Sequence, residues 1–242
     1  MGVHTSLVSS VLSVGILVVI TFILWNRIQL ISRSLKLPES ERNSVGRVSG
    51  IFLFGWLLIS LALAVLDFYH VTPQFISPLV PLGFALPVII GLHLMQNSST
   101  FQKVLDALPQ ELLILLQVPR IGGVVFLLLY MQGVLPALFA IPSGVGDLIV
   151  GLSAPIVWYY YSKNGAWSRN LAIAWNAVGI LDLAIAIITG VLLAVPPQYS
   201  IISSTPSTEP MTLFPLVLIP VFAVPLGLLM HVFSLRLLLK RT

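Results

Sequence analysis

The sequence has no cysteine and very little charge. With no cysteine among its 242 residues, disulfides, thiolate catalysis, cysteine-ligated zinc and iron–sulfur clusters are excluded. Only 8% of the residues are charged and 57% are hydrophobic, whereas soluble domains carry about 25% charged residues. This composition predicts a protein that has lipid as its solvent.

Long apolar stretches follow one another along the whole chain, separated by short polar segments. Because a helix of about 20 residues crosses the roughly 30 Å of hydrocarbon in a bilayer, seven of these stretches are long enough to span it. The sequence therefore predicts an all-α polytopic membrane protein with one seven-helix transmembrane domain, residues 1–242, and the lipid bilayer as its partner. The expected helices are Ser6–Trp25, Val48–Phe68, Pro78–Met95, Ile121–Phe139, Val145–Tyr161, Leu171–Val195 and Leu213–Leu235, with a tight turn at Ile141–Gly144.

The basic residues fix the expected orientation. This threading places all twelve Lys and Arg residues on one side of the membrane, whereas the outer loops at 69–77 and 196–212 contain none. Since cytoplasmic loops are enriched in Lys and Arg, the N-terminus is predicted to lie outside and the C-terminus in the cytoplasm. Basic residues at helix ends meet anionic lipid headgroups, so nucleic acid is not an expected partner.

Two parts of the sequence repeat the same pattern. Phe84-Ala85-Leu86-Pro87 precedes His93, and Phe222-Ala223-Val224-Pro225 precedes His231 at the same offset. This recurrence predicts two parallel three-helix repeats, 6–95 and 143–236, joined by a linker at 96–142. Chance coincidence of apolar tetrapeptides is the alternative, and it is left open.

A 3+1+3 arrangement with an outside N-terminus resembles the parallel-repeat sugar transporters in its architecture. Proteins of the PQ-loop type carry Pro-Gln pairs within or beside the first two helices of each repeat. Here Pro73-Gln74 and Pro197-Gln198 precede the third helix instead. The resemblance therefore implies topology only and transfers no functional residue.

Three acidic residues lie at or within the predicted helices. Asp67 and Asp147 stand near the outer ends of the second and fifth helices, and Asp182 stands near the middle of the sixth. Small residues share their helical faces, so these carboxyls are expected to point into the bundle. An intramembrane carboxyl is a functional candidate by default. The alternative is a protonated group that only hydrogen-bonds a neighbouring helix or, for Asp67, a side chain that simply reaches water.

The cytoplasmic half contains further polar side chains, at Arg120, Asn176, His93 and His231, with Gln117 at its edge. Neutral His and Asn often only bridge helices, and Arg120 can be a snorkelling residue at the interface. If the repeat is real, His93 and His231 face each other and would form a bis-histidine haem or metal site. Interior prolines favour a cavity between the third and seventh helices.

These observations favour a small membrane transporter or channel that binds a cation, a proton or a small solute in an outward-facing acidic cavity. Asp67 and Asp147 would stand at its mouth and Asp182 at its floor. Beyond the floor lie His231, Asn176 and Arg120, and no fixed cation is expected to neutralise the acids.

Two other classes of function stay open from the sequence. One is a membrane enzyme or redox protein, which would use either the His93 and His231 haem or a metal held by Asp147, Asp182 and His231, although depth separates Asp147 from His231. The other is a subunit of a larger membrane complex. The sequence assigns no catalytic residue and no cofactor, and it leaves oligomerisation open.

Overall fold

The computed structural model describes residues 7–35, 37–71, 77–194, 202 and 204–240. Within these residues all regular secondary structure is helical, and seven helical stretches are long and apolar enough to cross a membrane. These findings confirm the predicted all-α class and suggest a multi-pass integral membrane protein. The direction in which the chain crosses the membrane stays a prediction.

The helices follow one another in a simple order. An antiparallel hairpin of α1 and α2 comes first and the third span follows it, a broken fourth span lies in the middle, and three long spans complete the chain. The bounds are α1 (Leu7–Ser34), α2 (Glu39–Val65), α3 (Leu79–Asn97), α4 (Ser99–Asp106), α5 (Gln110–Leu115), η1 (Val118–Gly123), α6 (Val124–Met131), α7 (Ala137–Ser162), α8 (Ser168–Leu192), η2 (Glu209–Thr212), η3 (Ile219–Ala223) and α9 (Val224–Lys240).

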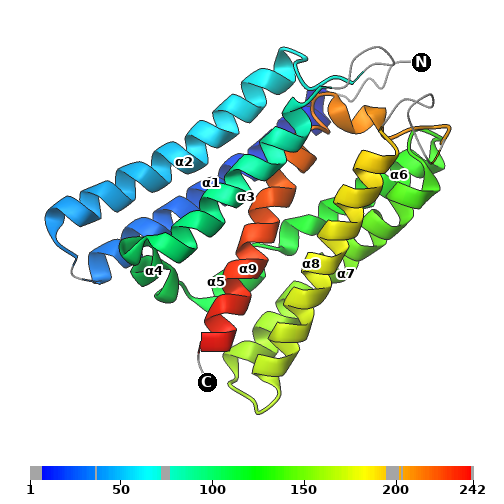
Figure 1. Cartoon of the computed structure of the whole chain (residues 1–242). Coiled ribbons are helices and arrows are strands. Elements are labelled where there is room, and N and C mark those ends of the chain that lie inside the picture. Colours follow the sequence, from blue (N-terminus) through cyan, green and yellow to red (C-terminus); the bar gives the residue numbers. More distant parts are fainter. Residues whose placement is uncertain (1–6, 36, 72–76, 195–201, 203, 241–242) are drawn as a thin grey trace.

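Helix α9 is the central element of the bundle. The α1–α2 hairpin lies on one side of the molecule and α7 with α8 on the other, with α9 between them (Figure 1). It packs against α3, α5 and α8. In the span Ile219–Lys240, which α9 forms with η3, 61% of the most apolar stretch is buried, compared with 22% in the span formed by α1. The polar side chains in the middle of α9, His231 and Ser234, therefore point into the protein interior and not into lipid.

The entry into α9 is held by a proline and a tryptophan. Pro225 has no N–H, so the carbonyl of Val221 in the π-helical turn η3 lacks its usual helical donor. The indole N–H of Trp56 in α2 donates to this carbonyl at 3.0 Å, and its ring lies 4.4 Å from that of Phe222. This pairing satisfies a buried backbone group and fastens the hairpin to the rest of the bundle.

The turn between the fourth and fifth spans differs from the sequence prediction. Helix α6 ends at Met131, and Gly133 follows with a φ of 70°. The amide of Gly133 donates to Tyr130 and that of Val134 to Leu129, both at 2.8 Å, which is the Schellman pattern of a helix C-terminus. The predicted turn at Ile141–Gly144 is wrong, because Pro142 lies inside α7, which begins eight residues earlier than expected.

Substituting Gly133 tests this turn. A Cβ at Gly133 would meet no atom within 4 Å, so the cost of Gly133→Ala comes from its left-handed backbone alone. We expect a loss of about 1 kcal/mol in the free energy of unfolding, measured by denaturation in detergent. Gly165→Ala is the matched control, because its Cβ also meets nothing and its φ is not left-handed. Equal stability of the two variants would contradict the motif.

For the fourth span the sequence predicts a helix from about Ile121, with Leu112–Leu116 either dipping into the bilayer or beginning the helix, and the structure has the earlier start. The span begins at Gln110 and not at Ile121. Pro119 interrupts it, and η1 replaces the α-helix for six residues, since a proline in a helix interior removes one hydrogen bond and clashes with the preceding turn. Arg120 therefore lies inside a span. The prediction that all twelve Lys and Arg residues lie at one side of the membrane is wrong for this residue.

At the basic end of the bundle, Asp106 ties α4 to α9. Its carboxylate accepts hydrogen bonds from Arg236 and Lys240. Partial burial raises the pKa of Asp106, but the two cations outweigh burial and hold the pKa below its usual value.

The proposed repeat at 6–95 and 143–236 is not tested by the arrangement of the helices and stays a prediction. Pro73-Gln74 and Pro197-Gln198 lie outside the described residues.

Candidate functional site

The guanidinium of Arg120 is the centre of a buried polar cluster. Its Nε donates to Asp147 Oδ1 at 2.7 Å, and its Nη2 donates to Asp182 Oδ2. Its Nη1 lies 3.0 Å from His231 Nε2 and 3.5 Å from the Gly179 carbonyl. Arg120, Asp147 and Asp182 are only 10%, 15% and 9% exposed. Four segments far apart in the sequence, η1, α7, α8 and α9, thus meet at one cation.

The hydrogen bonds of His231 fix its tautomer. Arginine only donates, so Nε2 of His231 must accept from Arg120, and Nδ1 carries the proton. Nδ1 lies 2.8 Å from Asn176 Oδ1, and Asn176 Nδ2 donates to the Ala172 carbonyl at 2.7 Å. The side chains of His231 and Asn176 are fully buried. The imidazole is therefore neutral and oriented as long as Arg120 stays in place. We call Arg120, Asp147, Asp182, His231 and Asn176 the Arg120 cluster.

Several glycines make the approach of these side chains possible. A Cβ on Gly123 would lie within 3.0 Å of Asp147, one on Gly146 within 3.0 Å of Asp182, and one on Gly179 within 3.0 Å of His231. Real Cβ atoms are almost never this close to another heavy atom. The prediction that Asp147 and Asp182 point into the bundle is confirmed, and glycine provides the space they occupy.

The depth of the cluster corrects two expectations. Because α7 begins at Ala137, Asp147 is its eleventh residue and lies about 15 Å along its axis. It therefore stands in the middle of the span and not at an outer mouth, and it shares a guanidinium with His231. The expectation that no fixed cation neutralises the acids is wrong, because Arg120 binds both of them.

The charges of the cluster do not balance when both carboxyls are ionised. One guanidinium then faces two carboxylates, and the neutral imidazole adds nothing. A single proton on either carboxyl makes the cluster neutral. Because a net charge is costly in a low-dielectric interior, the cluster has room for one exchangeable proton. The carboxyls of Asp147 and Asp182 can therefore bind and release one proton. That proton can move to His231 only if Arg120 turns away from the imidazole.

Other candidate residues lie elsewhere. Asp67 follows α2 with a φ of 61°, is 61% exposed and pairs with His70, which also contacts Glu209 at 3.2 Å. The expectation that Asp67 points into the bundle is wrong, because the helix ends two residues before it. Gln117 donates to the Gly227 carbonyl of α9 at 3.1 Å and so helps to hold the broken span against α9.

The two histidines do not form a pair. His93 is exposed on α3 and contacts Asn97 at 3.1 Å, whereas both nitrogens of His231 are engaged by Arg120 and Asn176. The expected bis-histidine haem or metal site is therefore not formed. Within the described residues no group of three or more His, Asp or Glu side chains has the arrangement of a metal site. The guanidinium stands between Asp147, Asp182 and His231, where a shared metal would have to be.

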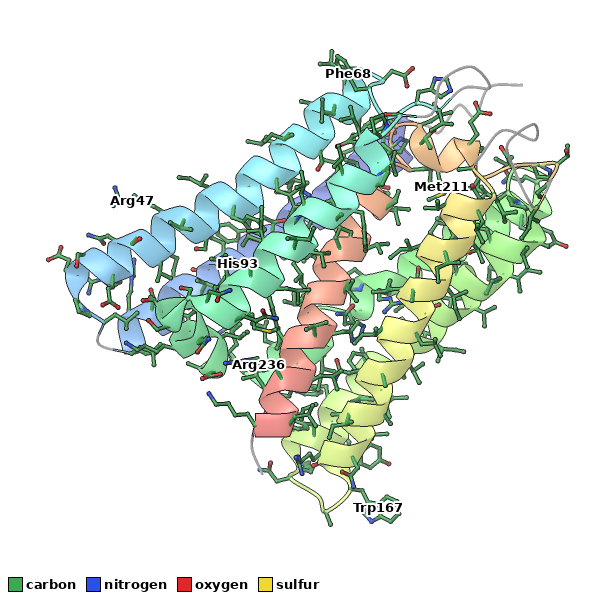
Figure 2. All side chains as sticks on the ribbon, in the orientation of Figure 1. Arg47, Phe68, His93, Trp167, Met211 and Arg236 are labelled. Atoms are coloured by element: carbon green, nitrogen blue, oxygen red, sulfur yellow. The ribbon has the colours of Figure 1, made fainter. Side chains whose placement is uncertain are left out.

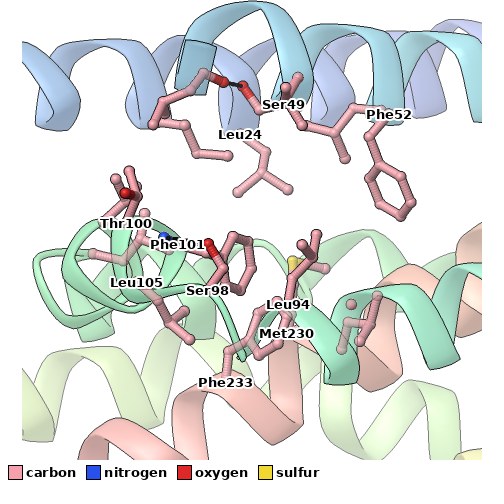
Figure 3. Close-up of a pocket in the computed structure, with 18 of the residues that line it drawn as sticks. Leu24, Ser49, Phe52, Leu94, Ser98, Thr100, Phe101, Leu105, Met230 and Phe233 are labelled. Atoms are coloured by element: carbon pink, nitrogen blue, oxygen red, sulfur yellow. Dashed lines mark hydrogen bonds between the residues drawn. The ribbon is translucent and has the colours of Figure 1, made fainter. Parts of the chain in front are cut away.

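A separate cavity of about 340 Å³ lies between the α1–α2 hairpin and α3, α4 and α9 (Figure 3). Both α3 and α9 line it, as expected for the third and seventh helices, but its walls are mainly apolar. Among its few polar groups, Thr100 donates to Glu41 at 3.4 Å. Helix α9 presents Met230 and Phe233 to this cavity and His231 to the Arg120 cluster, so the two lie on different faces of one helix. An outward-facing acidic cavity stays a prediction.

The sequence contains a signal for the broken span. Pro119, Gly122 and Gly123 surround Arg120 within an apolar stretch, and such breakers mark an interrupted helix. An arginine within an interrupted span is expected to face protein and not lipid. The partners of Arg120 could not be chosen from this signal.

The chain matches a known protein family. Residues 77–239 match the family model described as "Domain of unknown function (DUF8737)". The chain belongs to this family. The DUF8737 region runs from just before α3 to the end of α9 and contains every member of the Arg120 cluster, whereas the α1–α2 hairpin lies outside it. No curated protein and no solved structure matches the chain.

Proposed function

We propose that this protein is a small membrane transporter or channel that moves protons, alone or with a solute, through the Arg120 cluster. The observation that carries the proposal is the charge count of one guanidinium against two carboxylates at mid-span. Ionisable groups at this depth commonly belong to ion pathways and proton relays. Of the cation, proton or small solute expected from the sequence, this proposal takes the proton, carried by either Asp147 or Asp182.

Arg120 acts as the gate in this proposal. Arginine keeps its proton in proteins, so it cannot pass a proton from Asp182 to His231 itself. It has to leave His231 Nε2, which then becomes free to accept. The η1 segment offers such a movement, because Pro119 has no N–H to donate and the chain next to Arg120 is a short 3₁₀ helix with two glycines. Discontinuous helices also form the binding sites of many transporters.

Proton flux into proteoliposomes tests this function. Purified protein is reconstituted with a pH-sensitive dye inside the vesicles, and a potassium gradient with valinomycin drives proton entry. We expect flux above that of protein-free liposomes and a loss of at least tenfold in Asp182→Asn, because one carboxyl removed from the pair leaves no excess negative charge to attract a proton.

Asp106→Asn is the control for this experiment. It makes the same chemical change at a carboxyl that pairs with Arg236 and Lys240 outside the cluster, and its flux should stay within about twofold of the wild type. Wild-type flux equal to that of empty vesicles, or unchanged flux in Asp182→Asn, would show that the cluster does not carry protons.

A further inference from the structure

Three arginines surround one polar hollow on the α1–α2 hairpin. Arg33 comes from the end of α1, and Arg42 and Arg47 come from the first turns of α2. The hollow has a volume of about 850 Å³, and its remaining lining residues are Trp25, Gln29, Asn43, Gly46 and Gly50. Figure 2 shows Arg47 on the outer side of α2, away from α9. We call this space the arginine hollow.

The two helices fit closely at the base of the hollow. Trp25 Nε1 donates to the Gly46 carbonyl at 3.2 Å. A Cβ on Gly46 would lie 2.5 Å from the side-chain nitrogen Nε2 of Gln29, and one on Gly50 would lie 3.0 Å from Trp25 Nε1. The two glycines therefore let the side chains of α1 lie directly on the backbone of α2, and the floor of the hollow is defined by packing.

The charged side chains among the described lining residues of the hollow are all arginines. Among the described residues no Asp or Glu lines it, and none of the three arginines forms an ion pair with a carboxylate. Glu41 lies on the other side of the hairpin, where it accepts from Thr100. Three arginines that line one hollow, with no carboxylate among its described lining residues, favour a phosphate, because guanidinium groups bind phosphate oxygens in pairs.

The position of the hollow identifies the source of that phosphate. Helix α1 has 28 residues, which gives a length of about 42 Å, and this exceeds the roughly 30 Å of hydrocarbon. The last turns of α1 and the first turns of α2 therefore stand at headgroup depth. Trp25 has the amphipathic ring typical of that depth. We infer that the arginine hollow binds the headgroup of an anionic phospholipid in the leaflet at the basic end of the bundle.

The site is independent of the Arg120 cluster and lies outside the DUF8737 region, so it can fail without affecting the proposed proton pathway. Its role would be to anchor the hairpin beside the bundle.

Lipid titration of the full chain in neutral detergent tests the inference. Phosphatidylglycerol is added, and bound lipid and melting temperature are measured by native mass spectrometry and thermal denaturation. We expect retention of one lipid and a rise in Tm with its concentration, since a ligand that binds only the folded state stabilises it. The triple variant Arg33→Gln, Arg42→Gln and Arg47→Gln should lose at least tenfold in apparent affinity.

The control variant Arg27→Gln, Lys103→Gln and Lys163→Gln removes the same charge from exposed positions outside the hollow, and its affinity should change less than twofold. The single variants Arg42→Gln and Arg47→Gln repeat the test if the triple variant does not fold. Equal losses in the two triple variants, equal binding of phosphatidylcholine, or equal protection by inorganic phosphate would each overturn the assignment to an anionic lipid.

Discussion

Replacing Arg120 by methionine is expected to destabilise the folded chain by about 3 to 5 kcal/mol, the range found when one partner of a buried ion pair is removed. The substitution leaves Asp147 and Asp182 facing each other without a cation, and Nε2 of His231 loses its donor. Unfolding in mixed detergent micelles measures the change. Arg27→Met is the control, because Arg27 is exposed and its loss should cost less than about 0.5 kcal/mol.

Removing the acids together with Arg120 separates charge from packing. The triple variant Arg120→Met, Asp147→Asn and Asp182→Asn has no ionised group in the cluster. Since neutral replacement of a buried ion network is often tolerated, we expect it to recover more than half of the stability lost in Arg120→Met. A cost below 1 kcal/mol for Arg120→Met, or no recovery in the triple variant, would contradict a buried charge network.

Substituting Gly179 by alanine is expected to cost about 2 to 3 kcal/mol. The new Cβ would lie within 3.0 Å of the His231 ring, which cannot turn away without losing Arg120 or Asn176. Overpacking of this kind destabilises by about 1 to 3 kcal/mol, and the displaced imidazole adds to it. The same micelle unfolding experiment measures the loss.

Gly55→Ala provides the matched control for Gly179→Ala. Gly55 is also a glycine in a predicted span, but its Cβ would meet no atom within 4 Å. Alanine there should be neutral or stabilise by up to about 1 kcal/mol, because glycine is a poor helix former. If both alanine variants were equally stable, Gly179 would not be the close contact that positions His231.

The apolar and basic patterns predicted the spans well, and the reason is physical. Lipid has no hydrogen-bonding groups, so each crossing must be a helix of sufficient length and low charge. This constraint acts on each segment by itself, and it placed α3 and α8 within three residues of their observed bounds. Helix α1 ends nine residues later, and α2 begins nine residues earlier, than the sequence predicts. The constraint does not act on turns, so the Schellman motif at Gly133 was overlooked and Pro142 was taken for a turn.

The error at that turn misplaced the candidate site. Moving the start of α7 from Val145 to Ala137 moves Asp147 from the end of a span to its middle. Starting the fourth span at Gln110 moves Arg120 inward in the same way. Two boundary errors thus hid the ion pairs, because depth in the membrane decides which side chains can meet.

The sequence by itself determined that this chain is helical, that it has seven stretches suited to a bilayer, and that it carries intramembrane carboxyls, since hydropathy and helical periodicity are local properties. Only the tertiary structure decided that Asp147, Asp182 and His231 share Arg120 and that His93 does not join them. That choice depends on where one span breaks and on which glycines allow four segments to approach. Contacts of this kind join residues up to 111 positions apart, and no local pattern encodes them.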